Sequence, residues 1–211
     1  YRKKYGDNLR LDRIMEKEGD SINNYKASKQ ADILMLFYLF SADEISDMFT
    51  HLGYTFDTIS IPRIIEYYSH RTSHGSTLSR LVFSWVLSRS NRKYSWNTFE
   101  RALSTDFHDI QGGTTSEGIH LAAMAGTVDM IQRCYTGLEV RNNILYINPL
   151  LPDELSEVKQ RIRYRSHWIE MQIDKKSITL TFESGWENPI TVKIKDKDFF
   201  FSEYCSIVVP L

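Results

Sequence analysis

The chain has 211 residues, of which 42% are hydrophobic and 25% charged, and its formal charge at pH 7 is -1. This composition is typical of a globular protein and excludes a disordered, collagen-like or low-complexity chain. The balance of 26 Lys and Arg against 27 Asp and Glu also argues against a nucleic-acid partner and against an anionic membrane surface.

The chain offers no candidate membrane span or export signal. Its most apolar run, residues 33–40, is much shorter than the roughly 20 residues that cross a bilayer, and the basic N-terminus has no apolar stretch behind it. We therefore expect a cytoplasmic protein with no membrane partner. Cys134 and Cys205 match no metal-ligand or redox spacing, which predicts two reduced thiols and no metal site. Because the numbering does not begin with Met, we expect the chain to be a piece of a longer protein.

Apolar residues recur at helical spacing up to about Leu138. The first expected helix has Ser28 as its cap and is apolar on nearly every face, so we expect it to be buried all round. Gly53 and Gly137 stand where the second and the last helix should end. The expected helices cover residues 28–40, 42–52, a segment from Pro62 onward, 76–90, 95–103 and 116–135.

After Asn143 the hydrophobic period changes to two, which indicates strands. Turn signals at 174–176 and 184–189 separate the runs. The strands are expected at 144–147, 161–164, 168–173, 178–182, 190–194 and 207–209. We therefore predict two domains, a helical one over 1–143 and a small antiparallel β-sheet or sandwich domain over 144–211.

The helices at 28–40, 76–90 and 116–135 are more apolar, or richer in small residues, than those between them. This alternation is expected of the inner and outer layers of an α/α toroid, with a plain helical bundle as the alternative. In a toroid, helices of one layer run in the same direction. The N-terminal ends of these three helices would then meet at one mouth, which is where we look for a site.

Residues 71–79, with the sequence RTSHGSTLS, place hydroxyls, a glycine and an imidazole at the start of a buried helix. Free backbone N–H groups, the positive end of the helix dipole and Ser or Thr hydroxyls together form an anion site, with phosphate as the obvious ligand. His74 could add a donor or a positive charge. In the alternative interpretation, Ser73 or Ser76 only caps the helix and His74 is structural.

Residues 109–120, with the sequence DIQGGTTSEGIH, precede the last helix. The glycine pair would let the backbone approach a ligand closely, and His120 would point toward the same mouth. Thr114 and Glu117 have the spacing of a capping box, which explains both structurally. A carboxylate near an imidazole is also what a general base needs, so Glu117 is a secondary candidate for that role.

Lys29 and Gln30 begin the first expected helix. An ammonium group and an amide are well suited to sugar hydroxyls, although a polar first turn is ordinary at the start of a helix. The sequence contains no metal-ligand spacing, P-loop or dinucleotide fingerprint.

Four blocks resemble, in this order, glycoside hydrolase family 65, which contains maltose, trehalose and kojibiose phosphorylases and some α-glucoside hydrolases. The blocks are KQAD at 29–32, residues 71–79, residues 111–127 and NPLLP at 148–152. The resemblance covers essentially the whole chain. It implies the last half of an (α/α)6 catalytic barrel over 1–143, followed by the C-terminal β domain of the family over 144–211.

The resemblance also implies roles for individual residues. Lys29 and Gln30 would hold the glucosyl unit, and Phe83 stands where family members often carry His. The residues implied in phosphate binding are His74, Ser76, Thr77 and His120, with Gly75 and Gly113 allowing close approach.

The implied reaction is an inverting phosphorolysis of an α-linked glucose disaccharide. A glutamate protonates the glycosidic oxygen while inorganic phosphate, the co-substrate, attacks the anomeric carbon from the opposite face and gives β-glucose 1-phosphate. No cofactor is expected. Because that glutamate belongs to an earlier part of the barrel, the chain should be inactive without the upstream part of the same enzyme.

Several alternatives stay open at this point. One is a hydrolase of the same family with Glu117 as base, and another is a non-catalytic sugar-binding module. Maltose, trehalose and kojibiose all remain candidate substrates. Two copies of the chain could also associate through exposed apolar helix flanks, as a homodimer.

Overall fold

The structure is a computed structural model, and it describes residues 2–6, 10–30, 32–110, 116, 118–183, 189–202 and 204–211. The chain separates into two compact units, Tyr1–Thr127 and Val128–Leu211. The change of hydrophobic period lies later, at 143/144. The contacts divide the chain earlier because the first strand and the helical turns before it pack against each other within the second unit.

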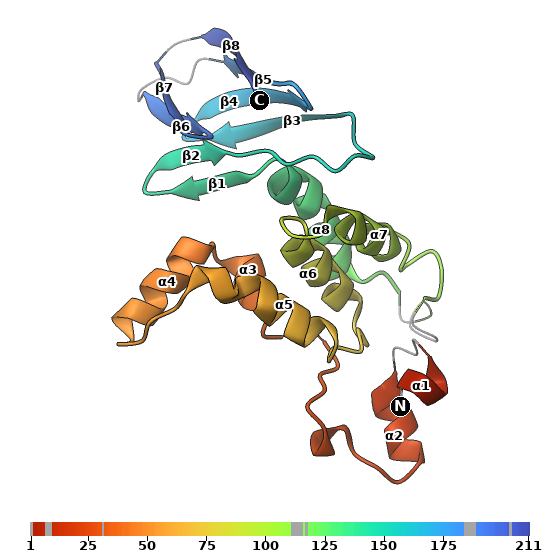
Figure 1. Ribbon diagram of the computed structural model, residues 1–211. Helices are drawn as coiled ribbons and strands as arrows, with labels where there is room; N and C mark the ends of the chain where they lie inside the picture. Colours follow the sequence, from red (N-terminus) through yellow and green to blue (C-terminus); the bar gives the residue numbers. More distant parts are fainter. Residues whose placement is uncertain are drawn as a thin grey trace. The chain divides into compact units, whose positions relative to one another are not determined.

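The first unit is helical, as the sequence predicts (Figure 1). Its elements are α1 (Arg2–Tyr5), α2 (Leu11–Lys17), η1 (Ile22–Asn24), α3 (Met35–Leu39), α4 (Ala42–His51), η2 (Thr58–Ser60), α5 (Ile61–Ser69), α6 (Thr77–Leu87), α7 (Arg92–Leu103) and α8 (Leu121–Asp129). A π-helix, η4 (Met130–Tyr135), continues α8 into the second unit.

Local signals account for the predicted helices that the structure confirms. Ser41 begins α4 with a capping box, in which its hydroxyl accepts from the Glu44 N–H and the Glu44 carboxylate accepts from the Ser41 N–H. Pro62 lies in the first turn of α5. Helix α7 begins at Arg92, earlier than predicted, because the Asn91 side chain caps it by accepting from the Tyr94 N–H at 3.1 Å.

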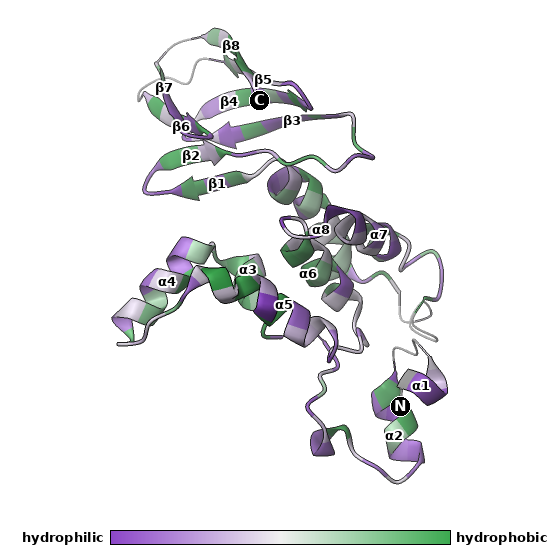
Figure 2. Cartoon of the chain, viewed as in Figure 1, coloured by the Kyte–Doolittle hydropathy of each residue, from purple (hydrophilic) through white to green (hydrophobic). Residues whose placement is uncertain are grey.

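The helix predicted over 28–40 is wrong over most of its length, because only α3 (Met35–Leu39) forms there among the described residues. Ser28 does not cap a helix but forms a parallel bridge with Thr72. Leu34 is fully buried, whereas Leu36 and Leu39 are 41% and 58% exposed, so the prediction of burial all round is also wrong. Figure 2 shows α3 as a strongly hydrophobic segment.

The core of the helical unit joins α3, α5 and α6. Its buried members are Leu34, Ile65, Val82, Phe83, Val86 and Leu87. Helix α6 is buried along nearly its whole length, and α7 is tied to it by a reciprocal serine pair. The Ser84 hydroxyl donates to the Ser95 carbonyl at 2.9 Å, and the Ser95 hydroxyl donates to the Ser84 carbonyl at 2.6 Å. These bonds satisfy polar groups that would otherwise be costly to bury.

The second unit contains two four-stranded sheets, with strand orders β1-β2-β6-β7 and β3-β4-β5-β8. The strands are β1 (Leu138–Arg141), β2 (Ile144–Ile147), β3 (Glu157–Tyr164), β4 (His167–Asp174), β5 (Ser177–Glu183), β6 (Ile190–Ile194), β7 (Lys197–Phe201) and β8 (Cys205–Pro210). Buried residues alternate with exposed ones along β4, and with half-buried ones along β5 and β6. Phe182 of one sheet stacks on Phe201 of the other at 3.7 Å between ring centroids, so the sheets share one core, as in a sandwich.

Two features of this unit differ from the prediction. Strand β2 pairs with β6 in parallel, because the chain leaves the first sheet after β2, builds β3, β4 and β5 in the other sheet, and returns with β6; such a crossover permits parallel pairing. Strands β1 and β7 were not predicted, since neither LEVR nor KDFFF shows a clear apolar alternation. The other strand pairs of the described chain are antiparallel, as predicted.

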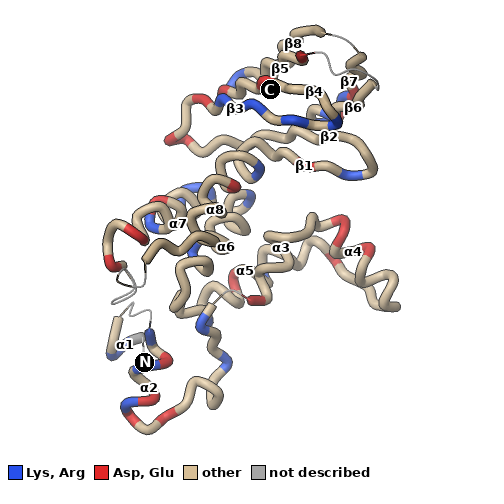
Figure 3. Tube along the Cα trace, turned by 180° about the vertical axis from the view of Figure 1, so that it is seen from behind, with Lys and Arg blue, Asp and Glu red and all other residues tan. Residues whose placement is uncertain are grey.

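Charges of both signs are interspersed along the chain, with several basic residues on β3 (Figure 3). Arg161 forms an ion pair with Glu183, and Lys159 forms one with Glu157. The basic residues of this strand are therefore partly neutralised.

Cys134 and Cys205 are not joined by a disulfide. Among the described residues, no helix combines the length and the apolar character needed to cross a bilayer.

Gly137 is a position where a side chain should be costly. Its φ is +61°, its carbonyl accepts from the Asn148 N–H at 3.1 Å, and an added Cβ would overlap the Asn148 backbone carbonyl. We expect Gly137→Ala to lower the free energy of unfolding by about 2–3 kcal/mol, since a left-handed residue costs roughly 1–2 and a disturbed hydrogen bond roughly 0.5–1.5 kcal/mol. Urea unfolding followed by circular dichroism measures this loss.

Gly53→Ala is the matched control for this prediction. Gly53 has a φ of +78° with open space around an added Cβ, so the variant should lose only the conformational part, about 1–2 kcal/mol. Equal losses in the two variants would show that the overlap with Asn148 has no cost.

Candidate functional site

Two of the three sequence-predicted segments lie side by side in the helical unit. The Ser28 N–H donates to the Arg71 carbonyl at 2.9 Å, and the Ser73 N–H donates back to the Ser28 carbonyl at 2.9 Å. One step further, the Gly75 N–H donates to the Lys29 carbonyl at 2.8 Å. The start of the predicted sugar segment is thus held against the predicted phosphate segment, although more than forty residues separate them in the sequence.

Buried hydroxyl groups stabilise the hydrogen-bonded pairing of the two segments. Thr72 is fully buried and donates to the Tyr68 carbonyl at 2.8 Å, and its hydroxyl lies 3.2 Å from that of Ser28. The side chains of Lys29 and Gln30 are exposed. The backbone of the sugar segment is therefore fixed, while its two polar side chains remain accessible to a ligand.

His74 lies between this pairing and α6 in a left-handed conformation, with φ +54°. Its Nδ1 lies 3.1 Å from the Ser79 hydroxyl, and its ring meets the Phe83 ring at 4.4 Å and 85°. Phe83 therefore contacts a candidate phosphate ligand directly. A left-handed conformation is uncommon for a residue other than glycine, and here it turns the imidazole back toward the first turns of α6.

The start of α6 lacks the side-chain cap that the structural alternative requires. Ser76 is the N-cap residue, yet it makes no side-chain cap hydrogen bond within the described part of the chain. The Ser73 hydroxyl is directed instead to the carbonyls of Ser28 and Lys29, at 3.4 Å each. Gly75 and Thr77 are buried at this helix start. Uncapped N–H groups at the positive end of a helix are suited to an anion.

His120 immediately precedes α8 and binds Asp106, a residue that the sequence analysis missed. Its Nδ1 lies 2.7 Å from Asp106 Oδ1, and its backbone N–H donates to Asp106 Oδ2 at 3.0 Å. The hydrogen bond from the His120 side chain, together with that from its backbone, holds the pKa of Asp106 below its ordinary value. No local sequence signal marks this aspartate, because its partner is fourteen residues away.

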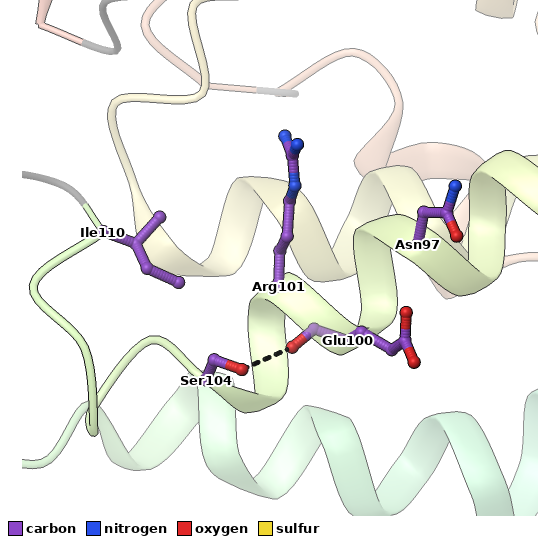
Figure 4. A pocket seen from close by; sticks show the side chains of 5 residues that line it. All are labelled: Asn97, Glu100, Arg101, Ser104 and Ile110. Carbon is purple, nitrogen blue, oxygen red and sulfur yellow. Dashed lines mark hydrogen bonds between the residues drawn. The ribbon is translucent and has the colours of Figure 1, made fainter.

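The remaining candidate residues, Gly113 and Glu117, lie outside the described residues. In the described part, no group of three or more His, Cys, Asp and Glu side chains is arranged to hold a metal ion. A hollow along α7 contains none of the predicted site residues; it is lined by Asn97, Glu100, Arg101, Ser104 and Ile110 (Figure 4).

Within the described part of the chain, His74 is hydrogen-bonded to Ser79 and His120 to Asp106, and the convergence of the two histidines on one hollow stays a prediction. The helices that follow them do meet. A Cβ added at Gly126 of α8 would overlap the Leu81 side chain of α6, and both residues lie in the second turn of their helix. The N-terminal ends of α6 and α8 therefore both lie near this contact between the two helices.

Comparisons with known proteins identify the family. Residues 1–129 match the family described as glycosyl hydrolase family 65 central catalytic domain, and residues 138–200 match the glycosyl hydrolase family 65, C-terminal domain. The chain belongs to glycoside hydrolase family 65, which confirms the resemblance seen in the sequence.

Several relatives are much longer than this chain. An uncharacterized glycosyl hydrolase of Mycobacterium tuberculosis is 51% identical over 92% of this chain and 15% of its own length. The trehalose 6-phosphate phosphorylase of Lactococcus lactis is 35% identical over 86% and 24%, respectively. The kojibiose phosphorylase of Thermoanaerobacter brockii is 30% identical over 81% and 20%. The chain thus spans about a quarter or less of each of these relatives.

A solved structure titled "Putative kojibiose phosphorylase from human microbiome" has a similar fold. It superposes with a TM-score of 0.69 at 24% identity, over 87% of this chain and 25% of its own. The fold class predicted from the sequence, a helical part followed by mainly antiparallel sheets, is confirmed.

Proposed function

We propose that this chain is part of an enzyme that cleaves an α-glucosidic disaccharide by inverting phosphorolysis and releases β-glucose 1-phosphate. The relatives named as phosphorylases support the reaction class. The observation that carries the proposal is the Gly75 N–H to Lys29 carbonyl hydrogen bond. Phosphate must reach the anomeric carbon of a held glucosyl unit, so residues that bind the sugar and residues that bind phosphate have to be neighbours.

We assign the sugar to the exposed side chains of Lys29 and Gln30, whose charged and amide groups suit hydroxyls. The uncapped start of α6 supports the assignment of phosphate to the residues around it. The phosphate ligands in this proposal are His74, Ser76, Thr77 and His120, with Gly75 and Gly113 allowing close approach.

The chemistry requires one catalytic carboxylic acid, which protonates the glycosidic oxygen as the bond to the anomeric carbon breaks. Phosphate takes the place of the water that an inverting hydrolase would activate with a second carboxylate. We place this acid, a glutamate, in an upstream part of the same enzyme. No cofactor takes part, and inorganic phosphate is the co-substrate.

We further propose that the helical part, residues 1–143, is half of an (α/α)6 barrel and that residues 144–211 form its C-terminal β domain. Exposed apolar side chains on and around α3 and α4 support the idea that the barrel is incomplete in this chain. They include Ile33, Leu36, Leu39, Met48 and Leu52. Further barrel helices, or a second copy of the chain in a homodimer, would cover these faces. We place the enzyme in the cytoplasm, where a charged sugar phosphate is retained by the cost of burying its charge in a bilayer.

The test uses the complete protein that contains this chain. Maltose, trehalose, kojibiose and trehalose 6-phosphate are each incubated with and without inorganic phosphate. We expect β-glucose 1-phosphate from one of them, and only when phosphate is present. Cleavage that is equally fast in phosphate-free buffer would overturn the proposal and favour a hydrolase of the same family.

A further inference from the structure

Asp106 holds His120 by two hydrogen bonds at once. One carboxylate oxygen lies 2.7 Å from the ring Nδ1, and the other accepts from the backbone N–H of the same histidine at 3.0 Å. Asp106 follows the end of α7 at Leu103, and His120 immediately precedes α8. Asp106, which follows α7, thus fixes the position of both the backbone N–H and the side chain of His120 at the start of α8.

The charge on Asp106 determines which ring nitrogen of His120 is available to bind a ligand. The two hydrogen bonds lower the pKa of Asp106, so at neutral pH it is a carboxylate and can only accept. Nδ1 must therefore carry a proton, and Nε2 is the ring atom directed away from the carboxylate. Within the described part of the chain, no residue forms a hydrogen bond with Nε2.

The pair is partly shielded from water. The Asp106 side chain is 10% exposed and that of His120 is 23% exposed. The two hydrogen bonds to Asp106 thus hold the His120 ring in one orientation, with Nε2 as the nitrogen turned away from the carboxylate.

We propose that Asp106 is a positioning residue for phosphate binding. It fixes the orientation and the tautomer of His120, so that Nε2 accepts from the P–OH of hydrogen phosphate, or donates to phosphate once the ring is protonated. This inference rests on the proposed function, because it needs phosphate as the ligand of His120.

Kinetics of the complete protein test this role. Asp106→Asn keeps the shape, but one carboxylate oxygen becomes an NH₂ donor. Because the backbone N–H still requires the remaining oxygen, the amide donates to Nδ1 and the neutral ring carries its proton on Nε2. We expect the KM for phosphate to rise roughly tenfold, with the KM for the sugar changed less than twofold. Asp106→Glu, which keeps the charge, should recover part of the loss.

A double variant separates positioning from a general structural role. If Asp106 acts through His120, adding Asp106→Asn to His120→Ala should leave the KM for phosphate as it is in His120→Ala alone. An additional tenfold loss would show that Asp106 acts independently of the histidine. Asp47→Asn is the control, since it removes one negative charge from an exposed position on α4 and should leave the KM for phosphate unchanged.

Nitrogen NMR of the histidine rings gives a readout that does not depend on activity. In the wild type, the neutral His120 ring should carry its proton on Nδ1, and in Asp106→Asn on Nε2. An unchanged tautomer together with an unchanged KM for phosphate would overturn the positioning role. If the wild type instead cleaves its substrate without phosphate, the proposed function fails, and the tautomer result alone still reports whether Asp106 sets the ring.

Discussion

The 211-residue chain by itself is expected to release no β-glucose 1-phosphate from maltose, trehalose or kojibiose at any phosphate concentration. In our proposal the general acid belongs to another part of the enzyme, and general acid catalysis alone contributes roughly 10²- to 10⁴-fold to such reactions. The sugar also has to be held against the acid, and an incomplete barrel loses that proximity as well. Together these losses should bring the rate below detection.

An assay that couples glucose 1-phosphate to NADPH formation measures this, with the chain at high concentration. The complete protein is the positive control, and addition of the separately produced upstream part should restore activity if the two parts associate. The same chain carrying His74→Ala controls for a contaminating phosphorylase. Turnover by the wild-type chain that His74→Ala abolishes would contradict the prediction and would show that the general acid lies within these 211 residues.

Local patterns predicted those helices whose ends are set by nearby residues. The 42–52 helix is one case, because its amphipathic period lies within the segment and its capping box joins Glu44 to Ser41, the residue directly before it. The 28–40 segment failed for a non-local reason. Its apolar run predicted a helix, but Ser28 pairs instead with the 71–73 segment through hydrogen bonds to Arg71 and Ser73. No propensity within residues 28–40 contains that information.

The candidate site, too, could be predicted only where its residues are adjacent in the sequence. Hydroxyls, glycine and imidazole at the start of α6 are adjacent in sequence, so His74 and its neighbours could be found from composition and helix physics. The Gly75–Lys29 hydrogen bond and the Asp106–His120 pair join residues far apart in the chain. Asp106 in particular follows a helix end, where an aspartate is ordinary. Only the fold shows that both of its oxygens bind one histidine.

In the complete enzyme, the second large effect expected is that His74→Ala and Lys29→Ala raise the KM values of different substrates. His74→Ala should raise the KM for phosphate by about ten- to a hundredfold, since loss of one charge-assisted hydrogen bond costs roughly 1.5–3 kcal/mol, and should change the KM for the sugar little. Lys29→Ala should raise the KM for the sugar instead. Initial rates with each substrate varied in turn measure the split, and His70→Ala and Lys26→Ala, both at exposed positions, are the matched controls. Because His74 also contacts Ser79 and Phe83, the melting temperature of the His74→Ala variant is measured as well.

If His74→Ala lowers that temperature but raises the two KM values equally, the imidazole supports the start of α6 and does not bind phosphate.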